Sequence, residues 1–313
     1  MPRIATILAA TDFSASGNNA VARAARLARH LNARLTLLHV VSPAGPPLRR
    51  WFSRPIAIAL EAARAQGALS RLGIDIAGPL DVAAAVEVRV GNPRVELLQA
   101  SAQADLLVLG HRHRNPLLRL ARGSMADRVL RSGRTPVLVV KRNAERSYRQ
   151  ALVPVDFKSH ADAALQVAAT LAPEWGIQVF HSIDTLGEAV LRDFDATEIT
   201  LRNARARQET HVHARMRRSV ARLGLDARRI SFALAHGAPA RSTLWQLRAS
   251  AADLVVAGKQ PRSAIAGLVP GSVSHRLLAK ADCDTLIVPR AARAVMPMRA
   301  SPFARAQLPT GQH

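Results

Sequence analysis

The stretch ADLLVLG at residues 104–110 returns almost unchanged as ADLVVAG at residues 252–258, an offset of 148. A Gly-Ser pair follows both copies with that same offset, at Gly123 and at Gly271. Each stretch is a short apolar run that ends in glycine, and a continuous rather than alternating apolar run is typical of a strand covered on both faces. The sequence therefore predicts a buried strand that occurs twice in one chain.

Further landmarks on both sides of this strand recur in the same order. They are TDFS at residues 11–14 and VDFK at 155–158, His39 and His181 after apolar runs, and Gly91 and Gly237, with offsets of 144, 142 and 146. A period near 145 residues is far too long for a solenoid repeat, so we interpret the chain as two copies of one globular domain. We expect the copies at residues 1–146 and 147–290, followed by a disordered basic tail at residues 291–313.

Both copies alternate short apolar runs with longer segments of helical periodicity. In the first copy we expect strands at residues 4–10, 34–41, 86–90, 105–110 and 136–141, and helices at 17–31, 55–72, 93–102 and 124–132. In the second copy we expect strands at residues 151–156, 178–183, 231–236, 253–258 and 284–289, and an arginine-rich helix within 188–223. Such alternation predicts parallel strands joined by right-handed crossovers. The fold class is therefore α/β, with two tandem doubly wound domains, each a five-stranded parallel sheet with helices on both faces.

The composition limits the classes of function. A single cysteine, Cys283, cannot form an intramolecular disulfide, and it excludes Cys-based zinc and iron–sulfur sites. No apolar run approaches the ~20 residues of a membrane span, and we expect a cytoplasmic protein. The 44 basic residues against 22 acidic ones give a net charge of +22, which attracts nucleotides, nucleic acid or anionic surfaces. A compositional bias towards arginine is the alternative source of this charge.

Ligands of doubly wound sheets bind at the carboxyl ends of the strands, near the point where the strand order reverses. Glycines and serines follow the predicted fourth strand there with one spacing in both copies. They are Gly110, Gly123 and Ser124 in the first copy and Gly258, Gly271 and Ser272 in the second. A phosphate group needs close backbone approach, N–H donors and the positive end of a helix. Glycine permits the first, and a helix that begins at the serine supplies the others.

With these residues the chain resembles the universal stress protein family, whose nucleotide-binding members carry Gly-x2-Gly-x9-Gly-Ser/Thr after the fourth strand. The resemblance covers both copies, over residues 1–142 and 148–290, and includes TDFS after the first strand and the ADLLVLG strand itself. It implies an adenine nucleotide alpha hydrolase-like fold. It also implies that the two copies pair through their last strands as a pseudo-dimer, and it leaves further homodimerisation open.

The resemblance also implies an adenine nucleotide, ATP, at one or both copies, with Mg²⁺ as its potential companion. In the first copy Asp12 and the backbone of Val40 and Val41 would border the adenine and ribose, and Gly110, Gly123 and Ser124 would face the phosphates. In the second copy the matching residues are Asp156, Ser182, Ile183, Gly258, Gly271 and Ser272.

The chain departs from the family pattern at one position of each copy. The family's second glycine is His113 in the first copy and Pro261 in the second, and Pro261 also lacks an N–H donor. Against this, Arg112 and neighbouring arginines in the first copy offer guanidinium groups that can neutralise phosphate from the side.

Simpler interpretations of the same residues stay open. The glycines need only shape the backbone between strands and helices, and Asp12 and Asp156 need only hydrogen-bond the loops that follow them. His39 and His181 are expected to be structural histidines at the rim of the core. The arginines within residues 188–223 are expected to form a solvated face.

Two further histidine pairs, His111 with His113 and His211 with His213, do not predict a metal site. No carboxylate or cysteine completes a ligand set beside either pair.

Catalysis finds little support in the sequence. It contains no nucleophile elbow, phosphate-binding loop or dinucleotide-binding turn, so we predict no catalytic residues and expect any ATP hydrolysis to be slow and incidental. The leading hypothesis is a tandem universal stress protein that regulates a stress response by binding an adenine nucleotide. The alternative is an arginine-rich protein that binds nucleic acid or an anionic surface and has lost nucleotide binding.

Overall fold

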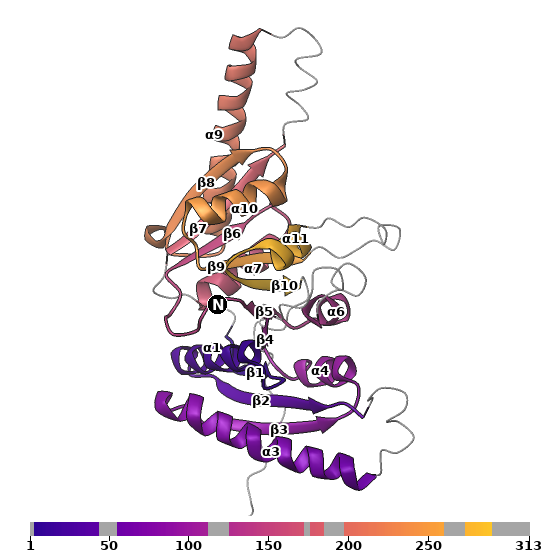
Figure 1. Ribbon diagram of the computed structural model, residues 1–313. Coiled ribbons are helices and arrows are strands. Elements are labelled where there is room, and N and C mark those ends of the chain that lie inside the picture. Colours follow the sequence, from indigo (N-terminus) through magenta and orange to yellow (C-terminus); the bar gives the residue numbers. More distant parts are fainter. Residues whose placement is uncertain are drawn as a thin grey trace, which may run out of the picture.

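The structure is a computed structural model that describes residues 3–43, 55–111, 125–171, 176–184, 197–259 and 273–289 (Figure 1). Several residues of the expected site lie outside these ranges. They are Arg112, His113, Gly123, Ser124, Pro261, Gly271 and Ser272. The expected tail at residues 291–313 also lies outside them.

The first half of the chain forms a regular alternation of strands and helices. Its elements are β1 (Thr6–Ala10), α1 (Ala15–Leu31), β2 (Arg34–Val41), α3 (Pro55–Ala77), η1 (Gly78–Leu80), β3 (Ala84–Val90), α4 (Pro93–Ser101), β4 (Leu106–Gly110), α6 (Met125–Ser132) and β5 (Val137–Val140). The predicted strands agree with these to within two residues at each end. Helix α3 continues five residues beyond the predicted end at residue 72, because its last turns still bury apolar side chains such as Ala77.

The second half repeats the same order. Its elements are β6 (Gln150–Pro154), α7 (Ser159–Leu171), β7 (Gly176–Ile183), α9 (Glu198–Arg222), η2 (Ala227–Arg229), β8 (Ile230–His236), α10 (Pro239–Ala249), β9 (Leu254–Lys259), α11 (Val273–Lys280) and β10 (Asp284–Pro289). The arginine-rich helix predicted within residues 188–223 is α9, described from Glu198 onwards.

All ten strands belong to one sheet, in the order β3-β2-β1-β4-β5-β10-β9-β6-β7-β8. Within each half every pair of neighbouring strands is parallel. The halves meet where β5 pairs antiparallel with β10, with Leu138 opposite Leu286. The predicted fold class, two doubly wound α/β domains, is confirmed. In each half the strand order reverses between two strands that are far apart in the chain, β1 and β4 in the first half and β6 and β9 in the second.

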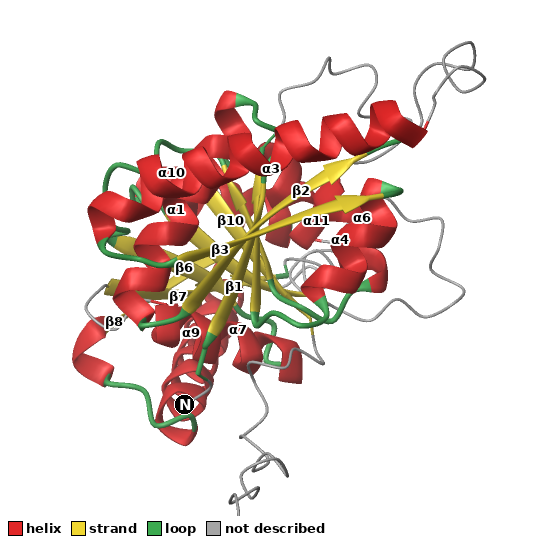
Figure 2. Ribbon diagram, turned by 90° about the horizontal axis from the view of Figure 1, so that it is seen from below, coloured by secondary structure: helices red, strands yellow, loops and turns green. Residues whose placement is uncertain are grey.

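Helices cover both faces of the sheet (Figure 2). One apolar core lies between the sheet and the helices α1, α3, α7 and α9, and includes Ala24, Leu165 and Met216. The other lies under α4, α6, α10 and α11, and includes Leu97, Val129 and Leu277. Because both faces are buried, inner strands such as β4 and β5 are apolar without alternation, which is the pattern that the sequence shows.

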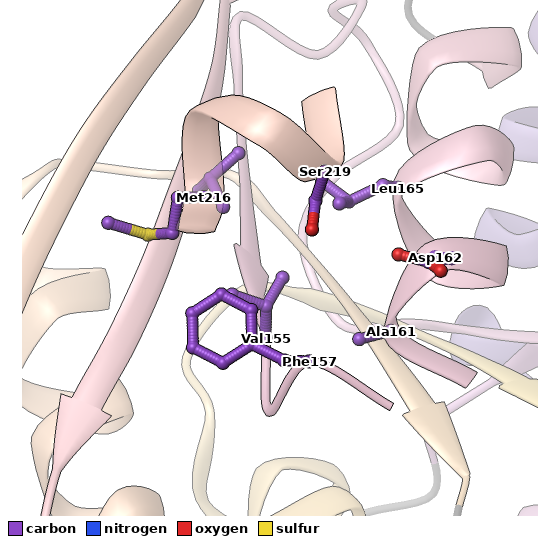
Figure 3. A pocket seen from close by; sticks show the side chains of 8 residues that line it. Val155, Phe157, Ala161, Asp162, Leu165, Met216 and Ser219 are labelled. Carbon is purple, nitrogen blue, oxygen red and sulfur yellow. The ribbon is translucent and has the colours of Figure 1, made fainter. Parts of the chain in front are cut away.

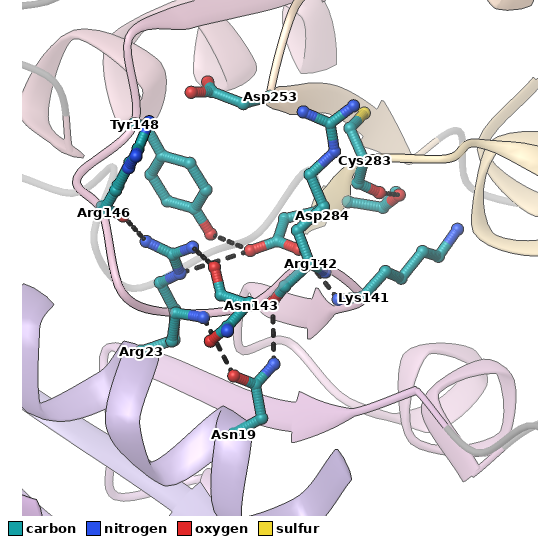
Figure 4. Close-up of polar contacts among 12 residues, drawn as sticks. Asn19, Arg23, Lys141, Arg142, Asn143, Arg146, Tyr148, Asp253, Cys283 and Asp284 are labelled. Carbon is teal, nitrogen blue, oxygen red and sulfur yellow. Dashed lines mark hydrogen bonds and ion pairs between the residues drawn. The ribbon is translucent and has the colours of Figure 1, made fainter.

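A buried ion pair joins the two halves close to the β5–β10 contact (Figure 4). Arg23 of α1 and Asp284 of β10 have side chains 4% and 0% exposed, and Arg23 Nε lies 3.3 Å from Asp284 Oδ2. The carboxylate also accepts hydrogen bonds from the backbone N–H groups of Lys141 (2.8 Å) and Arg142 (2.9 Å) and from the Tyr148 hydroxyl (2.6 Å). One carboxylate of the second half therefore binds both the first half and the segment that connects the two halves.

The guanidinium of Arg23 is held by the connecting segment as well. Its Nη1 and Nη2 donate to the backbone carbonyls of Arg146 (2.5 Å) and Asn143 (3.2 Å). Its Cζ lies 4.2 Å from the centre of the Tyr148 ring, in a cation–π contact. The charge of Arg23 is thus compensated on several sides although water is excluded.

Two groups at this junction, the Cys283 thiol and the Tyr148 hydroxyl, have a raised pKa. Burial raises the pKa of the Cys283 thiol to about 12 and raises the pKa of the Tyr148 hydroxyl well above its usual value, and the Asp284 carboxylate adds to both shifts. A group whose pKa is raised by folding contributes stability below its unfolded pKa and loses it as the pH rises towards the folded pKa. We therefore expect the free energy of unfolding to fall as the pH rises from about 9 to about 12, measured by urea titration at fixed pH steps.

The variant Cys283→Ala isolates the contribution of the thiol. Its free energy of unfolding should fall less steeply over the same pH range than that of the wild type, because one of the two protons is gone. Equal slopes in both proteins would contradict the raised pKa of the thiol.

Candidate functional site

The carboxyl ends of the parallel strands bring the described residues of the expected site to one edge of the sheet in each half. In the first half Asp12 follows β1, Val40 and Val41 end β2, and Gly110 ends β4. Because β1 neighbours both β2 and β4, these three strand ends lie side by side. They surround the point where the strand order reverses, which is where ligands of such sheets bind.

The loop after β1 is shaped by local hydrogen bonds. Asp12 Oδ1 accepts from the backbone N–H of Ser14 (3.2 Å) and from its hydroxyl, and Ser14 Oγ accepts from Gly17 N (3.2 Å) as the N-cap of α1. Asp12 therefore hydrogen-bonds the loop that follows it, as the simpler interpretation of this residue expected. Asp12 itself is exposed.

A phenylalanine in the left-handed region of backbone conformation follows the aspartate in both halves. Phe13 and Phe157 both have a φ of 60°, which is a costly conformation for a non-glycine residue and is concentrated at functional sites. The rings of His39 and His181 stack on them, with centroid distances of 4.4 Å and 4.7 Å. The same contact between a histidine and a phenylalanine ring therefore holds the loop in both halves.

The two stacked histidines also bond the loop backbone. His39 Nδ1 lies 2.9 Å from the Thr11 carbonyl, and His181 Nδ1 lies 2.7 Å from the Val155 carbonyl. Burial lowers the pKa of His181, with a smaller contribution of the same sign from the positive charge of Arg215. These contacts are those of structural histidines at the rim of the core, as the sequence predicted.

The ends of β2 and β7 are paired in the same way in both halves. The carbonyl of Val41 accepts from Gly91 N (3.0 Å), and that of Ile183 accepts from Gly237 N (2.9 Å). Ser182 donates its hydroxyl proton to the Gly237 carbonyl (2.7 Å). The backbone expected beside the adenine and ribose is therefore held rigidly by the loop after the third strand of each half.

The strand-end glycines have a packing role that sequence reasoning missed. A Cβ atom placed on Gly110 would meet the backbone of Ser16 and Gly17, in the first turn of α1, well inside van der Waals contact. A Cβ atom on Gly258 would meet the backbone of His160, in the first turn of α7, in the same way. Glycine at these positions lets the helix approach the end of its strand. A role towards phosphate stays a prediction for both residues.

The second half differs from the first in a residue that sequence reasoning did not single out. His160 is buried, 6% exposed, and its Nε2 lies 2.9 Å from Asp156 Oδ2. Asp156 Oδ1 accepts from the backbone N–H of Lys158 (3.1 Å). The predicted ligand-binding aspartate of this half is therefore bound by its own chain through both oxygens. Asp156 lies in the loop before α7 and His160 in its first turn, and their spacing of four residues was the signal that could have revealed the pair.

A narrow crevice beside this loop is shown in Figure 3. Met216 and Ser219 of α9 close it over Phe157 and Leu165, and it is too narrow to hold a water molecule. Its lining is mainly apolar, and the guanidinium of Arg215 lies over the Phe157 ring at 4.3 Å. The crevice is a gap in the packing of α9 on α7 and lacks the polar groups and the volume that a nucleotide needs.

Two further features were searched for among the described residues. No group of three or more His, Cys, Asp or Glu side chains is arranged there to hold a metal ion. No helix in that part of the chain is both long and apolar enough to cross a membrane.

Comparisons with known proteins agree with the repeated architecture. The sequence model described as the Universal stress protein family matches residues 4–141 and again residues 147–289. A curated universal stress protein of Mycolicibacterium smegmatis (strain ATCC 700084 / mc(2)155) is 27% identical over 302 residues, which cover 90% of this chain and 96% of the relative.

One solved structure of similar length gives the same result for the fold. A universal stress protein from Archaeoglobus fulgidus DSM 4304 superposes with a TM-score of 0.68 at 18% identity, over 91% of this chain and 96% of its own. A universal stress protein crystallised in complex with cAMP is 25% identical and covers 44% of this chain and 97% of its own, with a TM-score of 0.37.

Proposed function

The chain belongs to the universal stress protein family as a tandem of two of its domains, and from this premise we propose that it is a non-enzymatic regulator that binds an adenine nucleotide such as ATP. The observation that carries the proposal is the exposed Asp12 at the point where the strand order of the first half reverses. Ligands of doubly wound sheets bind there, and the family resemblance implies an adenine and ribose beside this residue.

The described residues of the first half fit such a ligand. The first turn of α1 places the small residues Ser16 and Gly17 against the end of β4, and Gly110 adds no side chain there. The carboxylate of Asp12 can accept a hydrogen bond from an adenine amino group or a ribose hydroxyl. The family resemblance implies that the phosphates and an accompanying Mg²⁺ would be bound by Gly123 and Ser124, with Arg112 and His113 as further candidates.

The non-enzymatic part of the proposal is supported by the contacts of the Ser14 hydroxyl, which lies in the loop after Asp12. Ser14 caps α1 and contacts Asp12, so its oxygen serves the backbone. The nucleotide, when bound, would supply negative charge and a surface that links the loops after β1, β2 and β4. The nucleotide-bound and nucleotide-free forms of the protein would then offer different surfaces to a cytoplasmic partner. The β5–β10 contact supports a pseudo-dimer of the two halves.

Titration with labelled ATP tests the proposal. We expect saturable binding with a Kd below about 1 mM, and at least about tenfold weaker binding by Gly123→Val, because a side chain there would block the phosphate. The matched variant Gly271→Val tests the second half in the same way, and circular dichroism confirms that both variants are folded. Competition by cAMP tests whether the adenine and ribose suffice. Absence of saturable binding, or equal affinity of wild type and Gly123→Val, would refute nucleotide binding at this site.

The nucleic-acid alternative rests on the net charge of +22 alone. Binding driven by phosphate neutralisation would weaken steeply with salt. Nucleic-acid binding that saturates at physiological salt would be needed to revive it.

A further inference from the structure

The candidate nucleotide site of each half, here called its crevice, lies where the strand order reverses: at the ends of β1 and β4 in the first half and of β6 and β9 in the second. It is distinct from the packing gap of Figure 3. The two crevices differ at one position in the first turn of the neighbouring helix. His160 in the first turn of α7 corresponds to Ser16 in the first turn of α1, at the same offset of 144 that relates Asp156 to Asp12. Both residues use their backbone in the same way, since each carries the carbonyl that lies against the strand-end glycine, Gly258 or Gly110. The difference therefore lies in the side chains alone.

The imidazole of His160 lies between the two strand ends that frame the second crevice. On one side its Nε2 is 2.9 Å from Asp156 Oδ2, just after β6. On the other side its Cδ2 is only 2.8 Å from the position that a Cβ atom of Gly258 would take, at the end of β9. Because β6 and β9 are neighbours at the reversal of strand order, the ring lies at the edge of the sheet where ligands of such folds bind.

The contact also engages the group that a ligand would need. The side chain of Asp156 is 37% exposed and that of His160 is 8% exposed, and they form a hydrogen-bonded pair. A nucleotide that took the carboxylate would leave the buried imidazole without its partner. An unsatisfied buried polar group is unfavourable, and the ring would still fill the space.

The first half has no imidazole at the corresponding position, which is Ser16. Ser16 turns its hydroxyl towards Ser14, at an Oγ to Oγ distance of 3.2 Å. The three atoms nearest to a Cβ placed on Gly110 are all backbone atoms of Ser16 and Gly17. Asp12 is exposed. At the position where the second half carries the imidazole of His160, the first half thus carries only the smaller side chain of Ser16.

We propose that His160 closes the second crevice, so that each chain holds one adenine nucleotide, in its first half. This inference rests on the proposed function, which it deepens by assigning the ligand to one half and the selectivity to one side chain. The structure of the second half does not fit the nucleotide as long as the imidazole stays in place.

The number of ATP molecules bound per chain tests the inference, measured by calorimetric titration and by native mass spectrometry. We expect one for the wild type, two for His160→Ser, none for Ser16→His, and one for the variant with both exchanges. His211→Ser, which removes an exposed histidine of α9, is the control and should still bind one. A second variant, His160→Ala, should also bind two, because it removes the imidazole without adding a hydroxyl group. Circular dichroism confirms that each variant is folded.

The outcomes separate the inference from the function on which it rests. Two nucleotides on the wild type would overturn the inference and leave the proposed function intact. One nucleotide on both the wild type and the folded His160 variants would also overturn it. No nucleotide on any of these proteins would refute the proposed function, and the inference with it.

Discussion

Replacing Asp284 with alanine should lower the free energy of unfolding by about 3–5 kcal/mol, which is the usual cost of removing one partner of a buried ion pair. The side chain is fully buried, and its carboxylate accepts the backbone N–H groups of Lys141 and Arg142 and the Tyr148 hydroxyl. Without it, these donors and the charge of Arg23 lose their partner in a place that water does not reach. The loss is expected to be large because several groups are left unsatisfied at once.

Urea unfolding followed by circular dichroism measures this effect, and the neighbouring Asp282 provides the control. Asp282 pairs with Arg248 on the surface, where the two side chains are 70% and 74% exposed. Because exposed ion pairs contribute about 0–1 kcal/mol, Asp282→Ala should change the stability little. A loss below about 1 kcal/mol for Asp284→Ala would show that the cluster is not a main contact between the halves.

A double variant separates the charge from the hydrogen bonds. Adding Arg23→Met to Asp284→Ala removes the buried cation that the first substitution leaves unpaired. The two changes together should therefore cost less than the sum of the single changes, by about 0.5–3 kcal/mol. Strict additivity would mean that Arg23 and Asp284 do not interact energetically.

Replacing Gly110 with alanine should destabilise the protein by about 1–3 kcal/mol, the usual cost of overpacking. The added methyl group would meet the backbone of Ser16 and Gly17, and a backbone in the first turn of a helix cannot rotate away as a side chain can. The helix α1 would have to retreat from the end of β4. Since Asp12 lies just before this helix, we expect ATP binding by the first half to weaken as well.

Gly67 in the middle of α3 is the matched control for Gly110. A Cβ atom on Gly67 would meet nothing within 4 Å, and alanine is a better helix former than glycine by about 0.5–1 kcal/mol. The two Gly→Ala substitutions should therefore have opposite signs, which thermal and urea unfolding can compare directly. A stabilising or neutral Gly110→Ala would contradict the close approach of α1 to β4.

The sequence predicted more of the fold than of the site. The ADLLVLG strand and its copy placed β4 and β9, and the continuous apolar runs placed the other strands, because a strand covered on both faces must be apolar throughout. The role of Gly110 could not be predicted from its neighbours in the chain, because the backbone that it accommodates belongs to residues about ninety positions earlier. The exposed Asp12 and its counterpart Asp156 look alike in the sequence, and only the structure separates them.

The amino-acid sequence by itself determined the duplication, the order of strands and helices in each half, and the family to which the halves belong, because these follow from periodicity and from motifs that are local in the chain. Tertiary structure alone decided that Arg23 is neutralised by Asp284 and that the imidazole of His160 lies between Asp156 and Gly258. The physical reason is that these contacts join residues from different elements. Their cost or gain depends on burial and on distance in space, which arise only when the sheet and its helices have packed.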